Sequence, residues 1–312
     1  NIVFASDLNS LSKGPYFDNQ LSLKGITKYF HNNYFLDNNT VYQNVLKFPK
    51  GSFGIFKNNE LKISSYIDKT YKFKNTKIDY EYIDDLLLNT VKSRMISDVP
   101  VGVFLSGGLD SSIIAYYASK IKADITTFTI GFEDKSYDES TKAEKVSRHL
   151  NLENKIYQLK NNDIGNLEKI VHELGEPLAD SSIIPTYYLS KFSRLDSKVC
   201  LSGDGGDEMF FGYTTYNASK LYKFINKIGL RRTFAILNKF IQMLPEKKTK
   251  VNYTFMFKKF FSSFDDYKSN PHLFWRQIIF NNFHYRIFKD KIKDKIINQQ
   301  KLNQINKFNL HP

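Results

Sequence analysis

The fold is decided by the stretch Val101-Gly102-Val103-Phe104-Leu105-Ser106-Gly107-Gly108-Leu109-Asp110-Ser111-Ser112. Its first five residues form an apolar run that predicts a buried strand. Ser-Gly-Gly then breaks the run, and Asp-Ser-Ser opens an apolar-periodic segment that predicts a helix. The two glycines allow a tight turn close to a ligand, and the free N–H groups of the first helical turn favour a phosphate. Asp110 is itself an anion, so we expect Mg²⁺ between its carboxylate and that phosphate.

This loop differs from the phosphate loop of kinases and GTPases, because no lysine follows its glycines. The pattern Ser-Gly-Gly-Leu-Asp-Ser-Ser at 106–112 instead resembles the loop of the ATP pyrophosphatase (PP-loop) enzymes. These enzymes cut ATP between its α- and β-phosphates. A glycine-rich turn with an Asp-Ser-Ser helix cap is the structural alternative. The length of the match favours ligand binding.

The 312-residue chain has room for one large or two ordinary domains. Its sequence contains no apolar run long enough for a membrane span and no secretory leader. It begins with Asn1 and not with methionine, so we expect a start inside a longer protein. The single cysteine, Cys200, excludes an internal disulfide and a cysteine cluster for zinc. A cytoplasmic location is expected.

The net charge of +13 is unevenly distributed along the sequence. From Tyr213 onward there are 20 Lys and Arg against 5 Asp and Glu, and the rest of the chain has 25 against 27. A basic half of this kind occurs in proteins that bind nucleic acid or anionic membranes. No nucleic-acid motif accompanies the charge, so we interpret the lysines as solvated and expect no nucleic-acid partner.

Residues 1–75 carry β-type patterns. Residues 3–5 predict a short strand, and residues 50–56 and 61–67 predict a hairpin around a polar turn. Residues 18–29 show weaker helical periodicity. The polar segment 69–79 is a predicted linker.

From residue 76 the patterns alternate between helix and strand, after a first helix that ends before Pro100. This alternation predicts an α/β fold, a doubly wound parallel sheet with helices on both faces. A basic, aromatic and mostly helical part follows from about residue 213. The predicted elements before it are helix 83–95, strand 101–105, a helix after Asp110, strand 125–132, helix 138–150, strand 155–159, helices 164–174 and 182–195, and strand 198–201.

A second loop, Ser202-Gly203-Asp204-Gly205-Gly206-Asp207-Glu208, follows the last predicted strand. Its three carboxylates repel one another unless a cation joins them. The loop lacks the spacing of a calcium-binding loop. Ligands of doubly wound sheets bind beyond the carboxyl ends of the strands, so we predict a metal and substrate site formed by this loop and the first one.

Five motifs together resemble the synthetase domain of glutamine-hydrolysing asparagine synthetase. They are Ser-Asp-Val-Pro-Val-Gly-Val-Phe-Leu-Ser-Gly-Gly-Leu-Asp-Ser-Ser (97–112), Thr-Phe-Thr-Ile-Gly-Phe (127–132), Tyr-Asp-Glu (137–139), Ala-Asp-Ser-Ser-Ile-Ile-Pro-Thr-Tyr (179–187) and Ser-Gly-Asp-Gly-Gly-Asp-Glu-Met-Phe-Phe-Gly-Tyr (202–213). The segments Phe4-Ala5-Ser6-Asp7 and Phe48-Pro49-Lys50-Gly51 resemble the last part of that family's glutaminase domain.

The resemblance implies a β-rich remnant of an N-terminal nucleophile glutaminase domain at 1–75. It also implies a sheet like that of the adenine nucleotide alpha hydrolases within a synthetase domain at 76–312. The implied reaction is ATP-dependent conversion of aspartate to asparagine with Mg²⁺. The side-chain carboxylate attacks the α-phosphate, pyrophosphate leaves, and ammonia derived from glutamine attacks the β-aspartyl-AMP. A homodimer is the expected assembly.

The resemblance also assigns roles by position. Asp110 and Asp207 would bind Mg²⁺ together with Asp138, and Asp204 matches an acidic position linked to attack by ammonia, where many members have Glu. Tyr213 either closes over the substrate or caps the helix expected from Glu208. The residues expected to contact ATP are Ser106, Gly107, Gly108, Ser111 and Ser112 at the pyrophosphate, Phe104 and Ile130 around adenine, and Leu105, Ser202 and Gly203 elsewhere on the nucleotide. Asp180, Ser181 and Ser182 join Tyr213 in substrate choice.

The sequence departs from the family in two places. The family's glutaminase nucleophile is a cysteine directly after the initiator methionine, and that region is missing here. Cys200 lies in a predicted core strand, where we expect a small buried hydrophobe. A distal segment with a lysine that assists adenylation is also missing before Pro312. We therefore expect a chain truncated at both ends that cannot use glutamine.

Two other functions remain open at this point. One is a related ligase that adenylates a carboxylate, of the β-lactam-forming or peptide-amidating kind. The other is a non-catalytic basic module that binds acidic partners through residues 213–312. The two acid-and-glycine loops argue against the second, because a binding module has no need of them.

Overall fold

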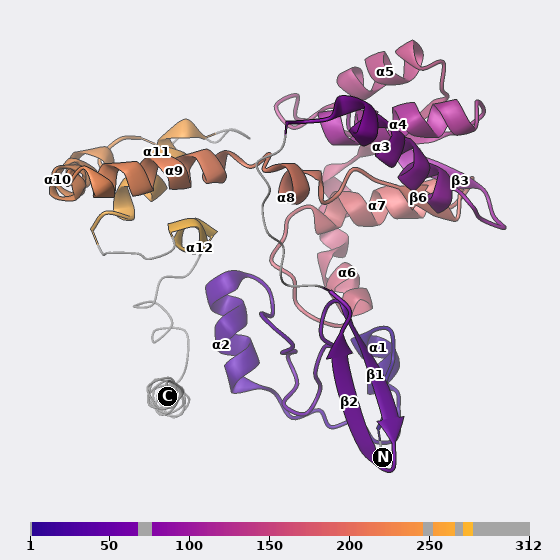
Figure 1. Cartoon of the computed structure of the whole chain (residues 1–312), viewed down its shortest axis with the longest axis horizontal. Coiled ribbons are helices and arrows are strands. Elements are labelled where there is room, and N and C mark those ends of the chain that lie inside the picture. Colours follow the sequence, from indigo (N-terminus) through magenta and orange to yellow (C-terminus); the bar gives the residue numbers. More distant parts are fainter. Residues whose placement is uncertain (1, 68–76, 246–251, 266–270, 277–312) are drawn as a thin grey trace. The chain divides into compact units, whose positions relative to one another are not determined.

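The computed structural model describes residues 2–67, 77–245, 252–265 and 271–276. The chain divides into two compact units (Figure 1). The first comprises residues 1–75, 168–181 and 276–312, and the second comprises residues 76–167 and 182–275. The expected linker at 69–79 and the polar end at 298–312 fall wholly or mostly outside the described residues.

The first unit contains a β-hairpin and short helices. β1 (Ser52–Lys57) pairs antiparallel with β2 (Glu60–Ser65). The turn between them places Asn58 and Asn59 at φ of 52° and 64°, a left-handed conformation that asparagine tolerates. The predicted hairpin is therefore confirmed. The short strand expected at 3–5 is wrong, because these residues pair with no other strand in the described part of the chain.

The helices of the first unit begin at side-chain caps. α1 (Leu8–Ser12) starts at Asp7, and α2 (Leu23–Asn32) starts at Ser22, whose hydroxyl accepts the Gly25 N–H. The helical pattern at 18–29 thus forms a helix that begins five residues later. Asn9 of α1 donates from its amide to the carbonyl oxygens of His172 and Glu173, at 2.8 Å each. These bonds tie the end of α6 (Leu167–Leu174) to this unit.

The second unit is built on a four-stranded parallel sheet. Its strands are β3 (Val101–Phe104), β4 (Thr127–Phe132), β5 (Asn154–Leu159) and β6 (Val199–Leu201). They are ordered β5-β4-β3-β6. The chain therefore moves outward from β3 to β5 and then returns to the other side of β3. The sheet has its topological switch point between β3 and β6, the position where such sheets bind ligands.

Helices cover both faces of this sheet. α4 (Leu109–Ile121) buries Ala115 and Ala118 against Val103 and Leu105 on one face. α5 (Ser140–His149) packs beside α4, and α3 (Tyr80–Arg94) packs on the outside of α4. α7 (Ile183–Ser193) covers the opposite face, where Phe192 meets the edge of Phe128 with ring centroids 6.1 Å apart. The predicted doubly wound α/β fold is confirmed.

The remaining elements are helical. A 3₁₀ turn at Asn161–Asn166 precedes α6, so the helix expected from residue 164 forms only in its later part. α8 (Gly206–Phe210) precedes the basic region. That region contains α9 (Thr214–Lys227), α10 (Arg231–Ile241), α11 (Tyr253–Ser262) and α12 (Pro271–Arg276). Tyr222, Ile225, Phe264 and Trp275 form its buried centre. Among the described helices, none is long and apolar enough to cross a membrane.

Cys200 lies in β6, which has a free edge among the described residues. The expectation of a small buried residue in a core strand is met only in part, because the side chain is half-buried. Burial still raises the pKa of its thiol above the ordinary value.

Candidate active site

The first loop, residues 105–108, joins β3 to α4 through a left-handed turn. Gly107 has a φ of 73°, which glycine adopts without strain. The space around it is also filled, because a Cβ at this position would lie 2.6 Å from the Ala143 backbone nitrogen. The glycine thus lets the loop pack against the first turn of α5.

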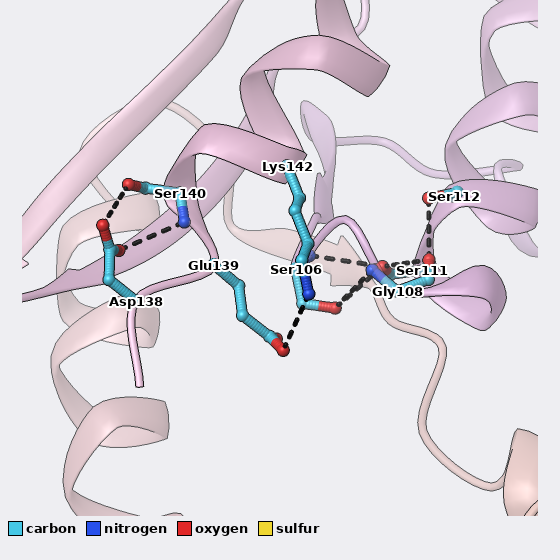
Figure 2. Close-up of polar contacts among 8 residues, drawn as sticks. All are labelled: Ser106, Gly108, Ser111, Ser112, Asp138, Glu139, Ser140 and Lys142. Atoms are coloured by element: carbon cyan, nitrogen blue, oxygen red, sulfur yellow. Dashed lines mark hydrogen bonds and ion pairs between the residues drawn. The ribbon is translucent and has the colours of Figure 1, made fainter. Parts of the chain in front are cut away.

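Hydroxyl groups hold this loop in shape (Figure 2). The Ser111 Oγ accepts the Ser106 N–H at 3.2 Å, lies 3.0 Å from the Ser106 Oγ, and donates to the Gly108 carbonyl at 3.2 Å. The Ser112 Oγ donates to the same carbonyl at 2.7 Å. The backbone N–H groups of Leu109, Asp110 and Ser111 have no acceptor among the described residues. They are free to bind an anion at the positive end of a 13-residue helix.

The second loop, residues 202–205, packs directly on the first. A Cβ at Gly203 would lie 2.6 Å from the Ser111 backbone nitrogen, and one at Gly206 would lie 2.5 Å from the Asp110 carboxyl carbon. At Gly203 the opposing atoms belong to the backbone, so only glycine allows this approach without moving the loops, whereas the Asp110 carboxylate beside Gly206 is the end of a side chain. Gly205 precedes α8 with a φ of 91°. The Asp204 carboxylate accepts the Ser202 hydroxyl at 3.0 Å.

The two loops form the wall of one cavity of about 560 Å³, a size suited to a nucleotide or a drug-sized ligand. The cavity lies at the carboxyl ends of β3 and β6, at the switch point of the sheet. Five of its lining residues are acidic, and none of the lining residues that the structure describes is basic. The lining residues are Phe104, Leu105, Ser106, Gly108, Asp110, Ser111, Ile130, Phe132, Tyr137, Glu139, Thr186, Leu189, Ser202, Gly203, Asp204, Gly205, Gly206, Asp207, Glu208 and Tyr213.

Most of the residues predicted from the sequence are brought together in this cavity. Gly107, Ser112 and Ser182 are not among its lining residues. Gly107 and Ser112 support the loop instead, by close packing and by the hydrogen bond to Gly108. Asp180 and Ser181 belong to the first unit, and their part in substrate choice stays a prediction.

Asp138 does not line the cavity either. Its carboxylate accepts hydrogen bonds from the Ser140 N–H at 3.1 Å and the Ser140 hydroxyl at 2.9 Å (Figure 2). It also accepts one from the Phe132 N–H at 3.3 Å. Burial alone would raise the pKa of Asp138, but these hydrogen bonds outweigh it and lower the pKa. Asp138 thus fixes the start of α5, and we leave it out of the proposed metal site.

The carboxylates that remain fit a magnesium ion shared with a phosphate. Asp110 and Asp207 both line the cavity, and the Asp110 carboxylate lies against Gly206, the neighbour of Asp207. Within the described parts of the chain, no three His, Cys, Asp or Glu side chains converge as a complete metal cage. Mg²⁺ typically takes one or two carboxylates and completes its coordination with phosphate oxygens and water.

Several lining residues were missed by the sequence reasoning. Tyr137 and Glu139 belong to a motif that carried the resemblance, and Glu208 ends the second loop, so these three could have been included. Phe132 lies at the end of β4 with Ile130. Thr186 and Leu189 come from α7, three residues apart on one helix face, and nothing in their types signals a site.

Tyr213 lines the cavity and also contacts the second loop. Its hydroxyl donates to the Glu208 carboxylate at 2.5 Å. α8 begins at Gly206 rather than at Glu208, and Tyr213 precedes α9 without capping it through a side-chain bond. Closure over the substrate therefore stays a prediction.

Known proteins resemble this chain in both of its parts. Residues 1–67 match the family model of the glutamine amidotransferase domain. Asparagine synthetase [glutamine-hydrolyzing] 1 of Bacillus subtilis is 32% identical over 237 residues, which are 74% of this chain and 37% of that protein. Putative asparagine synthetase [glutamine-hydrolyzing] 2 of Methanocaldococcus jannaschii is 42% identical over 146 residues, 46% of this chain and 28% of that protein.

The chain thus spans about a third of the length of these relatives. Among solved structures, the NH3-dependent NAD synthetase of Campylobacter jejuni is 19% identical, with a TM-score of 0.34 over 44% of this chain and 61% of that one. The model of the asparagine synthase family matches residues 82–285, which include both loops, the whole sheet and the cavity between them. The chain belongs to the asparagine synthase family.

Proposed function

We propose that the cavity binds ATP with Mg²⁺ and aspartate, and that it forms asparagine through a β-aspartyl-AMP intermediate. The observation that carries this proposal is the contact between the two loops, where Gly203 and Gly206 lie on Ser111 and Asp110. It brings N–H groups from the first turn of α4 and acidic side chains onto one wall, an arrangement that suits a phosphate and its cation. Membership of the asparagine synthase family supports the same reaction.

Each loop has a distinct part in this proposal. The first-turn N–H groups of α4 and the Ser106 hydroxyl bind the pyrophosphate portion, while Ser111 positions the loop through its bonds to Ser106 and Gly108. Asp110 and Asp207 would hold Mg²⁺, which would neutralise charge on the phosphates. Phe104 and Ile130, at the ends of β3 and β4, supply apolar surface for adenine.

The second loop would act on the acceptor side. Asp204 is the candidate for accepting a proton from ammonia as it attacks the adenylate. Its link to the Ser202 hydroxyl fixes one of its oxygens. Bringing the carboxylate and the α-phosphate together in one cavity supplies the positioning on which such a reaction depends. For the whole protein, glutamine as the source of ammonia, a homodimer and a cytoplasmic location belong to the same proposal.

The test is product analysis with ATP, Mg²⁺, aspartate and ammonia. The proposal predicts AMP and pyrophosphate in equal amounts, dependent on aspartate. ADP and orthophosphate would refute it. Formation of AMP with a different carboxylate but not with aspartate would assign the site to a related carboxylate-adenylating ligase instead.

A further inference from the structure

The negative charge of the cavity wall disfavours the binding of a nucleotide. Five carboxylates line it, and no Lys, Arg or His is among the lining residues that the structure describes. A triphosphate is repelled from such a wall unless cations accompany it, because charges interact strongly in a partly enclosed site. Mg²⁺ would neutralise part of this negative charge. Any cationic group that the protein itself supplies has to come from a side chain next to the residues that line the cavity.

Lys142 is a cationic residue of α5 whose side chain starts in contact with the first loop. A Cβ at Gly107 would lie 2.7 Å from the Lys142 Cβ, so the lysine and the turn of the loop are in contact. Figure 2 shows the Lys142 side chain extending from α5 and ending beside the Glu139 carboxylate. Its ammonium is therefore held on the side of the loop where Glu139 lines the cavity.

The ion pair that holds Lys142 is easily exchanged. The Lys142 Nζ lies 4.0 Å from the Glu139 Oε1, and the two side chains are 69% and 37% exposed. Pairs of this kind contribute little to stability. Lysine has three donors on a flexible stem, so its ammonium can turn to another anion nearby. A phosphate group bound on the first loop would be such an anion.

We propose that Lys142 binds the pyrophosphate portion of ATP and leaves Glu139 as the nucleotide enters. The inference rests on the proposed function, because it takes the nucleotide phosphates to lie on the first loop. Glu139 keeps the ammonium beside the loop before binding. After binding, the phosphate accepts a charge-assisted hydrogen bond from Lys142. Repulsion between Glu139 and the phosphate opposes the binding.

Equilibrium binding to the 312-residue chain tests this proposal. The ligands are ATP with Mg²⁺, pyrophosphate with Mg²⁺, and AMP. We expect Lys142→Ala to raise the Kd for ATP and pyrophosphate about tenfold, the size of one charge-assisted hydrogen bond, and to leave the Kd for AMP unchanged. Lys142→Arg should retain most of the affinity. Lys145→Ala is the matched control, because Lys145 lies on α5 but lines a separate hollow with Leu87 and Tyr116.

The outcomes separate this inference from the proposed function. An unchanged Kd for ATP in Lys142→Ala would overturn the role of Lys142 and leave the proposed function standing. A loss of AMP affinity equal to the loss of ATP affinity would have the same meaning. A wild-type chain that binds neither ATP nor AMP would overturn both.

A double-mutant cycle gives a second measurement. Glu139→Gln should tighten ATP binding, because it removes both a repulsive charge and the competitor for Lys142. The gain should be smaller in the Lys142→Ala background, where no ammonium can be released. Equal gains in the two backgrounds would contradict the exchange.

Discussion

Gly203→Ala tests whether the contact between the loops builds the site. The added Cβ would lie 2.6 Å from the Ser111 nitrogen and 2.8 Å from the Asp110 carbonyl carbon, whereas ordinary contacts begin near 3.4 Å. Both atoms belong to the backbone at the start of α4, which cannot rotate away as a side chain can. The loops must therefore separate by most of an ångström.

The separation should cost both stability and ligand binding. Overpacking of this kind typically costs about 1–3 kcal/mol of unfolding free energy, or a fall in Tm of roughly 2–4 °C per kcal/mol in a chain of this size. A displacement near 1 Å can lower the rate of a positioned reaction by about a hundredfold. Thermal unfolding measures the loss of stability, titration with ATP and Mg²⁺ measures the loss of binding, and the release of AMP measures the loss of rate.

Gly165→Ala is the matched control for this substitution. Gly165 lies in the same unit, and a Cβ there has no atom within 4 Å. The control should keep the Tm and the ATP affinity of the wild type. If Gly203→Ala behaved like Gly165→Ala in both assays, the close packing of the loops would not be what positions the site.

Three further substitutions or assays follow from the structure. Asp110→Asn should abolish pyrophosphate release and the Mg²⁺ dependence of ATP binding while the Tm stays within a few degrees; normal turnover would refute the metal role. Asp138→Ala should lower the unfolding free energy by about 1 kcal/mol at neutral pH, because it removes the carboxylate that accepts the Ser140 N–H and hydroxyl at the start of α5. Because its pKa is lowered from 3.8, this advantage of the wild type is complete above pH 3.8 and should vanish as the pH falls through the lowered value; a difference independent of pH in chemical denaturation would contradict it. The chain should release no glutamate from glutamine, because burial raises the pKa of Cys200 and so disfavours its nucleophilic thiolate; glutamate detected by a coupled assay would show otherwise.

The alternation of strands and helices was predictable because the periodicity of apolar residues is a local property. β3 (Val101–Phe104) is buried along most of its length, and strands buried on both faces are continuously apolar. The crossing of the chain from β5 to the far side of β3 has no local signal, since nothing in Val199 to Leu201 specifies its neighbour. The strand expected at 3–5 failed for the same reason, because a strand requires a partner.

The site was predictable to the extent that its chemistry lies in loops of unusual composition. Glycines and carboxylates after two apolar runs indicated a phosphate and metal site, and Asp110 and Asp207 now lie on one cavity wall. The metal role of Asp138 stays a prediction, because a carboxylate that orders the start of a helix and one that binds a metal look alike in a sequence. Its hydrogen bonds to Ser140 favour the first, and these require coordinates.

Transfer of oxygen from aspartate to AMP tests the central claim most directly. The proposed reaction has the β-carboxylate attack the α-phosphate, so one carboxylate oxygen must remain on AMP when ammonia displaces it. With aspartate labelled with ¹⁸O in its side chain, ATP, Mg²⁺ and ammonia, we predict one ¹⁸O in the phosphate of AMP by mass spectrometry. Unlabelled AMP, or label appearing in orthophosphate, would contradict attack by the carboxylate in the cavity between the two loops.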